Sequence, residues 1–105
     1  MRLTTAERTA IAQAARETLP PGAKVSLFGS RVDDNRRGGD IDLLIEPNMA
    51  LPPVEQVALR TRLAARLYRT MGERRIDIVL AALGMADERL IVSEARRQAV
   101  EVVRT

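Results

Sequence analysis

The stretch Asp40-Ile41-Asp42-Leu43-Leu44-Ile45-Glu46 decides the fold of this 105-residue chain. Acidic and branched apolar residues alternate, which is the period-2 pattern of a β-strand. Asp40 and Asp42 therefore share one face, and Ile41, Leu43 and Ile45 point into the core. Residues 75–80, Arg-Ile-Asp-Ile-Val-Leu, repeat the pattern around Asp77. If the two strands are neighbours, the three carboxylates Asp40, Asp42 and Asp77 converge on one polar face.

Three converging carboxylates point to a site for divalent cations. They repel one another and raise each other's pKa values unless a cation neutralises them. Mg²⁺ prefers oxygen ligands and usually binds through one or two carboxylates together with substrate phosphates. Two such ions can clamp an in-line phosphoryl or nucleotidyl displacement, while a carboxylate orients or deprotonates the attacking hydroxyl. Taken alone, Asp77 is also explained as half of an ion pair with Arg74 or Arg75.

A Gly-Ser turn precedes the acidic strand, in Leu27-Phe28-Gly29-Ser30-Arg31. It ends the predicted apolar strand Lys24–Phe28. Gly29 allows a ligand to approach the backbone closely. Ser30 is a favourable N-cap that can meet a phosphate oxygen at a helix N-terminus. Arg31 adds a charged contact.

At these residues the chain resembles the minimal nucleotidyltransferases (MNT) of the DNA polymerase beta superfamily. The family pattern is hydrophobic-Gly-Ser, then Asp-x-Asp on a second strand, then a third Asp on a later strand. Residues 22–80 carry it here. The resemblance implies an α/β, palm-like fold, a small mixed sheet flanked by helices. It implies that Asp40, Asp42 and Asp77 are catalytic and bind Mg²⁺, with Mn²⁺ as the alternative, and that Gly29, Ser30 and Arg31 hold the triphosphate.

The resemblance also implies a partner. Small proteins of this kind are commonly antitoxins of HEPN-family toxins and transfer AMP from ATP to a tyrosine of the toxin. We therefore expect an Mg-dependent adenylyltransferase acting on a HEPN-type protein. Two alternatives stay open: a non-catalytic module that neutralises its partner by contact, and an enzyme that adds nucleotides to RNA 3′ ends.

Composition agrees with one domain spanning residues 1–105. Cysteine and histidine are absent, which excludes disulfides, thiolate chemistry and imidazole catalysis and is compatible with the cytoplasm. No apolar run is long enough for a membrane span. The net charge of +3 permits contact with phosphates, but only Phe28 and Tyr68 are aromatic, which disfavours single-stranded nucleic acid as a partner.

The remaining pattern alternates helix and strand. Thr4 and Glu7 form a capping box for a helix that ends before Pro20. Residues 31–39 are expected to form a short helix and a mobile loop. A long helix is expected from Pro52 to Met71, and its apolar arc is wider than one sheet face needs. Either this helix has a second contact surface, which is compatible with a homo-oligomer, or it lies between the sheet and another helix. A last helix is predicted over 86–98 and an edge strand over 100–103.

Overall fold

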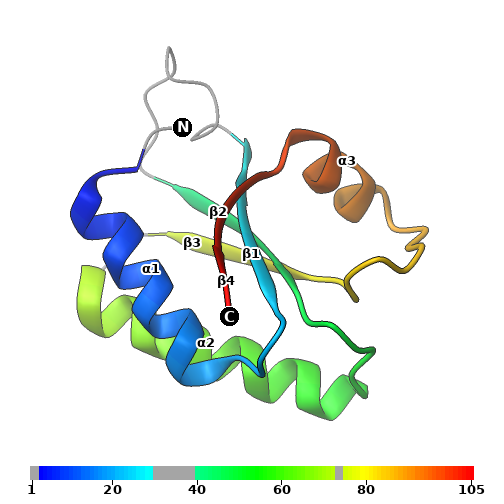
Figure 1. Cartoon of the computed structure of the whole chain (residues 1–105), viewed down its shortest axis with the longest axis horizontal. Coiled ribbons are helices and arrows are strands. Elements are labelled where there is room, and N and C mark those ends of the chain that lie inside the picture. Colours follow the sequence, from blue (N-terminus) through cyan, green and yellow to red (C-terminus); the bar gives the residue numbers. More distant parts are fainter. Residues whose placement is uncertain (1–2, 30–39, 73–74) are drawn as a thin grey trace.

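The computed structural model describes residues 3–29, 40–72 and 75–105. Four strands form one mixed sheet in the order β3-β2-β1-β4. In chain order these are β1 (Lys24–Phe28), β2 (Ile41–Glu46), β3 (Ile76–Leu80) and β4 (Val100–Arg104), with helices α1 (Thr5–Thr18), α2 (Pro53–Met71) and α3 (Leu90–Gln98) between or before them (Figure 1). β1 is antiparallel to β2 and β4, whereas β2 and β3 are parallel. The predicted α/β fold with a small mixed sheet is confirmed.

The two faces of the sheet bury different sets of side chains. On one face, Ile41, Leu43 and Ile45 of β2 pack with apolar residues of α1 and α2. On the other, Leu44 packs with Phe28 and with α3. The inward orientation predicted for the β2 isoleucines and Leu43 is confirmed, because all three are fully buried. Asp42 projects from the same face as Leu44. Helix α3 covers this face except at the end where Asp42 lies.

Helix α1 begins as the capping box predicts. The Glu7 backbone N–H donates to Thr4 Oγ1 over 3.0 Å, and the Thr4 N–H donates to Glu7 Oε1 over 2.9 Å. Both bonds satisfy N–H groups that the first helical turn leaves without partners. Thr105 extends the pairing of β4 with β1, because its N–H donates to the carbonyl of Ala23, the residue before β1, over 2.8 Å.

Helix α2 begins at Pro53 and ends at Met71, close to the predicted bounds, and its wide apolar arc divides into an exposed part and a buried part. The exposed part of the arc includes Val54, Val57 and Tyr68, which are 80%, 60% and 44% exposed. The buried part consists of Leu59, Leu63 and Leu67, which face the core and are each at most 4% exposed. Their spacing of four residues places three large side chains on one stripe of the helix. Burying this stripe removes more apolar surface from water than burying the valines and alanines on the opposite side would.

The last helix is shorter than predicted. It begins at Leu90, and residues 86–89 lead into it without helical structure. The Asp87 carboxylate accepts hydrogen bonds from the Arg89 N–H and guanidinium, and such local side-chain bonds compete with helix formation. The predicted edge strand is confirmed as β4, which extends to Arg104. None of the helices in the described ranges is long and apolar enough to cross a membrane.

Candidate functional site

Asp42 and Asp77 lie side by side at the beginning of the two parallel strands β2 and β3. They are direct partners in the strand register. Because paired positions of neighbouring strands project to the same face, both carboxyl groups leave the sheet together, on the side opposite to Ile41 and Leu43. The predicted pairing of the two acidic strands is therefore confirmed at the backbone level. Asp77 is half exposed, so this end of the sheet is open to a ligand.

The electrostatics of the pair match the expectation for crowded carboxylates. Burial raises the pKa of Asp42, and the charge of Asp77 and a hydrogen bond with it raise the pKa further. Asp40 acts in the same direction through its charge, while Arg75 lowers the pKa of Asp42. A bound cation would relieve this repulsion, which is the physical reason to expect one here.

Gly29 directly follows β1 and lies beside Asp42, because Phe28, the last residue of β1, is the register partner of Asp42. Its φ of 78° lies in the left-handed region that favours glycine. A Cβ at Gly29 would lie 2.3 Å from Asp42 Oδ2, so only a glycine leaves room for the carboxylate in this position. The turn that the sequence predicted at Gly29 thus has a second role, because it makes space for the acidic pair.

The Gly29 N–H is already engaged. It donates to Oε1 of Gln98, the last residue of α3, over 3.1 Å. Sequence analysis missed Gln98 as a residue of the site. It lies 69 positions away, and only the packing of α3 against β1 brings it to the turn, so no local pattern could have identified it.

The other predicted site residues behave differently. Ser30, Arg31 and the predicted loop over 31–39 lie outside the described residues. Arg75 Nε approaches Asp77 Oδ2 at 3.6 Å, so the ion pair considered for Asp77 is present, between exposed side chains. Across 3–29, 40–72 and 75–105, no group of three or more acidic side chains is arranged to hold a metal ion. The structure brings Asp42 and Asp77 together, with Asp40 two residues before Asp42 in the chain.

The far end of the same sheet face carries a different kind of acid. Glu46 is 5% exposed, and its Oε2 accepts from Arg96 Nε over 3.0 Å. The Arg96 guanidinium also donates to the carbonyl oxygens of Ala82 and Met85. Glu46 is thus a structural acid that fixes α3 to the sheet, in contrast to the crowded pair at the other end.

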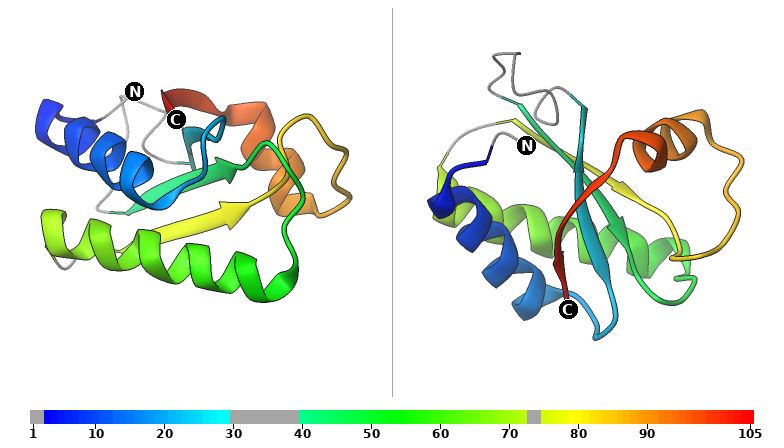
Figure 2. Two further views of the ribbon diagram at one scale, coloured as in Figure 1. Left: turned by 60° about the horizontal axis from the view of Figure 1, so that its bottom comes forward. Right: turned by 45° about the horizontal axis from the view of Figure 1, so that its top comes forward.

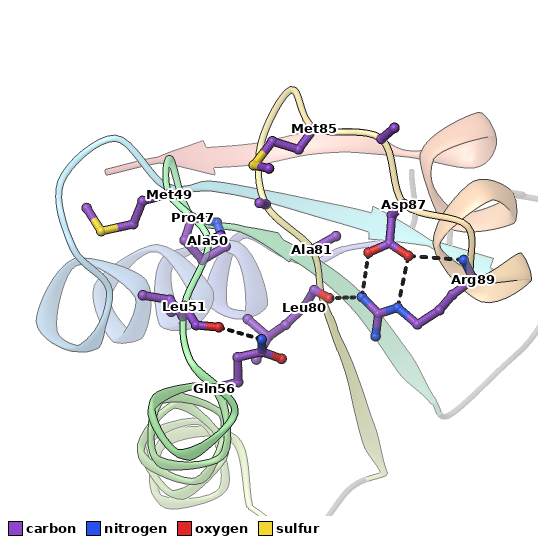
Figure 3. Close-up of a pocket in the computed structure, with 12 residues that line it drawn as sticks. Pro47, Met49, Ala50, Leu51, Gln56, Leu80, Ala81, Met85, Asp87 and Arg89 are labelled. Carbon is purple, nitrogen blue, oxygen red and sulfur yellow. Dashed lines mark hydrogen bonds and ion pairs between the residues drawn. The ribbon is translucent and has the colours of Figure 1, made fainter.

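A pocket of about 220 Å³ opens at the C-terminal ends of β2 and β3, remote from Asp42 and Asp77 (Figure 3). Met49, Leu51 and Met85 give it an apolar lining. Arg89, which also lines the pocket, is paired with Asp87, and hydrogen bonds from Arg89 lower the pKa of the Asp87 carboxyl to about 2. The chemistry that the sequence predicted therefore belongs to the opposite end of the sheet.

The fold is that of the MNT nucleotidyltransferases, and solved structures match this chain over nearly its whole length. One is a toxin–antitoxin complex with AMP-PNP, at a TM-score of 0.61 and 21% identity, covering 93% of this chain and 73% of that one. A second is the MntA–HepT complex, at a TM-score of 0.60 and 20% identity, covering 97% and 74%.

A third match is a Shewanella oneidensis MNT antitoxin in complex with its tri-AMPylated HEPN toxin, at a TM-score of 0.60 and 21% identity, covering 94% of this chain and 71% of that one. No protein-family model and no curated protein matches the sequence. The likeness therefore establishes the fold and confirms the predicted resemblance at that level.

Proposed function

We propose that this chain is a metal-dependent nucleotidyltransferase that transfers AMP from ATP to a hydroxyl of a HEPN-type partner, and that it serves as the antitoxin of that pair. The observation that carries the proposal is the register pairing of Asp42 with Asp77 beside Gly29. AMP-PNP in one matched complex and an AMPylated HEPN toxin in another support the choice of nucleotide and acceptor.

The donor set fits Mg²⁺. Asp42 and Asp77 offer oxygen ligands from adjacent strands, and the raised pKa of Asp42 reflects a repulsion that a cation would remove. Two carboxylates are enough, because Mg²⁺ commonly completes its shell with waters and substrate phosphates. We assign Asp40, Asp42 and Asp77 as the residues that would hold it. When bound, the ion would polarise phosphoryl oxygens and neutralise charge on the leaving group.

The rest of the chemistry falls to the chain's own groups. The acceptor hydroxyl oxygen attacks the α-phosphorus of ATP, the bond to the bridging oxygen breaks, and pyrophosphate leaves. Asp77, half exposed at the edge of the site, would accept the hydroxyl proton. The Gly29 N–H would bind an oxygen of the departing triphosphate tail, and Ser30 and Arg31 would extend that contact.

Calorimetric titration of ATP with Mg²⁺ tests the nucleotide site. We expect binding by the wild type that depends on the metal and is lost in the Asp40→Asn/Asp42→Asn double variant. Glu101→Gln is the matched control, because Glu101 is exposed on β4 and pairs with the neighbouring Arg104. Metal-dependent binding that survives in the double variant would contradict the assignment.

Transfer is tested with ATP labelled at the α-phosphate and a purified HEPN-type protein as the acceptor. We expect label on the partner protein, with a mass increase of one AMP for each modified hydroxyl, and none with the double variant. Label appearing on RNA instead would favour the alternative of 3′-end addition.

A second candidate is a module that neutralises its partner by contact alone. The Arg75–Asp77 ion pair supports it, because an acid that is already paired has less need of a cation. In that case the double variant would still protect cells from the toxin. Loss of protection in a double variant that still binds the toxin would exclude this candidate.

A further inference from the structure

The side of α2 that points away from the core is apolar. On a helical wheel, Leu59, Leu63 and Leu67 mark the buried direction, and residues at the opposite side are Val54, Val57, Ala58, Thr61, Ala65 and Tyr68. A surface helix ordinarily carries charged and polar groups there. We call this set the outer stripe. Val54 is 80% exposed and Val57 60%, and in the left-hand view of Figure 2 none of the other described helices and strands lies beneath α2.

Arginines border the outer stripe. Arg62 and Arg69 lie along one edge and Arg60 along the other, and all three are exposed. Within the described part of the chain, none of the three forms an ion pair. Arg66, further round on the side of α1, is bound to Glu17 over 2.9 Å. The described residues therefore place an apolar ridge between positive charges on this helix, and Glu55 is the single acid in the sequence from Pro53 to Met71.

This arrangement decides between possible occupants. A second copy of the chain would set arginine edges against each other, which is unfavourable at an interface. Nucleic acid would use the arginines but leave the valines and alanines without a partner, and single strands bind largely by aromatic stacking, which Tyr68 alone cannot supply. A protein helix with an apolar ridge flanked by carboxylates satisfies both features.

We propose that the outer stripe of α2 is the surface on which the HEPN-type partner docks, through an amphipathic segment that carries carboxylates beside its apolar ridge. The identity of the partner rests on the proposed function; the location of the surface rests on the exposure and charge of α2. The two sites are then separate, because α2 packs on the sheet face opposite to Asp42 and α3.

The test measures binding of the HEPN-type protein without ATP. Val54→Glu/Val57→Glu places charge on the ridge, and we expect the dissociation constant to rise about tenfold or more, as for central positions of an interface. Leu90→Glu/Ile91→Glu is the matched control, since these side chains are 75% and 50% exposed on α3, and it should bind as the wild type does. Arg60→Glu/Arg62→Glu should weaken binding and reduce its dependence on salt.

The outcomes separate this proposal from the nucleotidyltransferase proposal. The valine variant should keep metal-dependent ATP binding, which also shows that it is folded, and the Asp40→Asn/Asp42→Asn variant should keep partner binding. A valine variant that binds the partner as tightly as the wild type would overturn the docking surface alone. RNA binding that is lost with the arginines but kept with the valines replaced would overturn it in favour of nucleic acid.

Discussion

Gly29 and Asp42 approach each other so closely that a single added carbon would displace the carboxylate. A Cβ at Gly29 would meet Asp42 Oδ2 at 2.3 Å and Asp42 Cγ at 3.1 Å. The position of the Asp42 carboxylate in the candidate metal site thus depends on the absence of a side chain at Gly29. The Gly-Ser turn and the Asp-x-Asp motif meet across the β1–β2 pair, because Phe28 lies opposite Asp42.

Gly29→Ala should therefore weaken nucleotide binding as well as stability. The left-handed φ of 78° costs a non-glycine residue about 1–2 kcal/mol, and the Asp42 carboxylate must rotate away from its position. Gly84→Ala is the matched control, because Gly84 has a φ of 73° and a Cβ added there would meet nothing within 4 Å. Urea unfolding should show a loss for both variants that is larger for Gly29→Ala, because only this variant also meets Asp42, and only Gly29→Ala should lose titratable binding of ATP with Mg²⁺. Unchanged binding in Gly29→Ala would separate the turn from the site.

Asp42 also makes the stability of the metal-free protein depend on pH. Its folded-state pKa lies above the ordinary value, so the native state holds the proton more tightly than the unfolded chain. Stability then falls as pH rises between the unfolded-state and folded-state pKa values, and the loss is complete above the latter. Asp42→Asn should raise the free energy of unfolding at neutral pH and leave it unchanged at a pH below both values. Urea unfolding of the two proteins without metal at both pH values checks this.

Asp77 is the largest charged contributor to that shift, so its removal should move the Asp42 titration. In Asp77→Asn we expect the pKa of Asp42 to fall toward its ordinary value, with burial leaving some elevation. Carboxyl carbon shifts in an NMR titration report this directly. Asp87 provides an internal reference, because its pKa of about 2 is set by Arg89 at the other end of the sheet and should not change. An unmoved Asp42 would mean that burial alone sets its pKa.

The strands and the acidic pair could be predicted from sequence because their signals are local. Alternation over 40–46 and 75–80 identified both strands and the face of each acid. The orientation of α2 could not be predicted, because the helix carries two apolar stripes and the sequence does not say which one meets the sheet. The stripe that faces the core is the one with the larger side chains, Leu59, Leu63 and Leu67, which are nearly fully buried. Gln98 was missed for another reason, because its contact with Gly29 depends entirely on tertiary packing.

Arg96 should contribute far more to stability than its neighbour Arg97. Arg96→Ala would leave the Glu46 carboxylate buried without a partner and free the carbonyls of Ala82 and Met85. We expect a loss of about 3 kcal/mol, the lower part of the range for a broken buried pair, because Arg96 is itself partly exposed. Arg97→Ala, which breaks the exposed pair with Glu94, should cost at most about 0.5 kcal/mol in urea unfolding. Equal losses would show that Glu46 is solvated after all.

Gln98 and the triphosphate should compete for the Gly29 N–H. The carboxamide Oε1 now accepts this bond over 3.1 Å, and in the proposed function a phosphate oxygen takes the same donor. Gln98→Ala removes the competitor, and because one hydrogen bond is worth about 0.5–1.5 kcal/mol net, affinity for ATP with Mg²⁺ should rise about 2- to 10-fold. Gln98→Glu keeps an acceptor at the same place and adds a negative charge beside the phosphates, so affinity should fall. Titration of both variants gives opposite signs if Gln98 competes with the nucleotide. Weaker binding in both would mean that the Gln98 amide instead donates to the nucleotide.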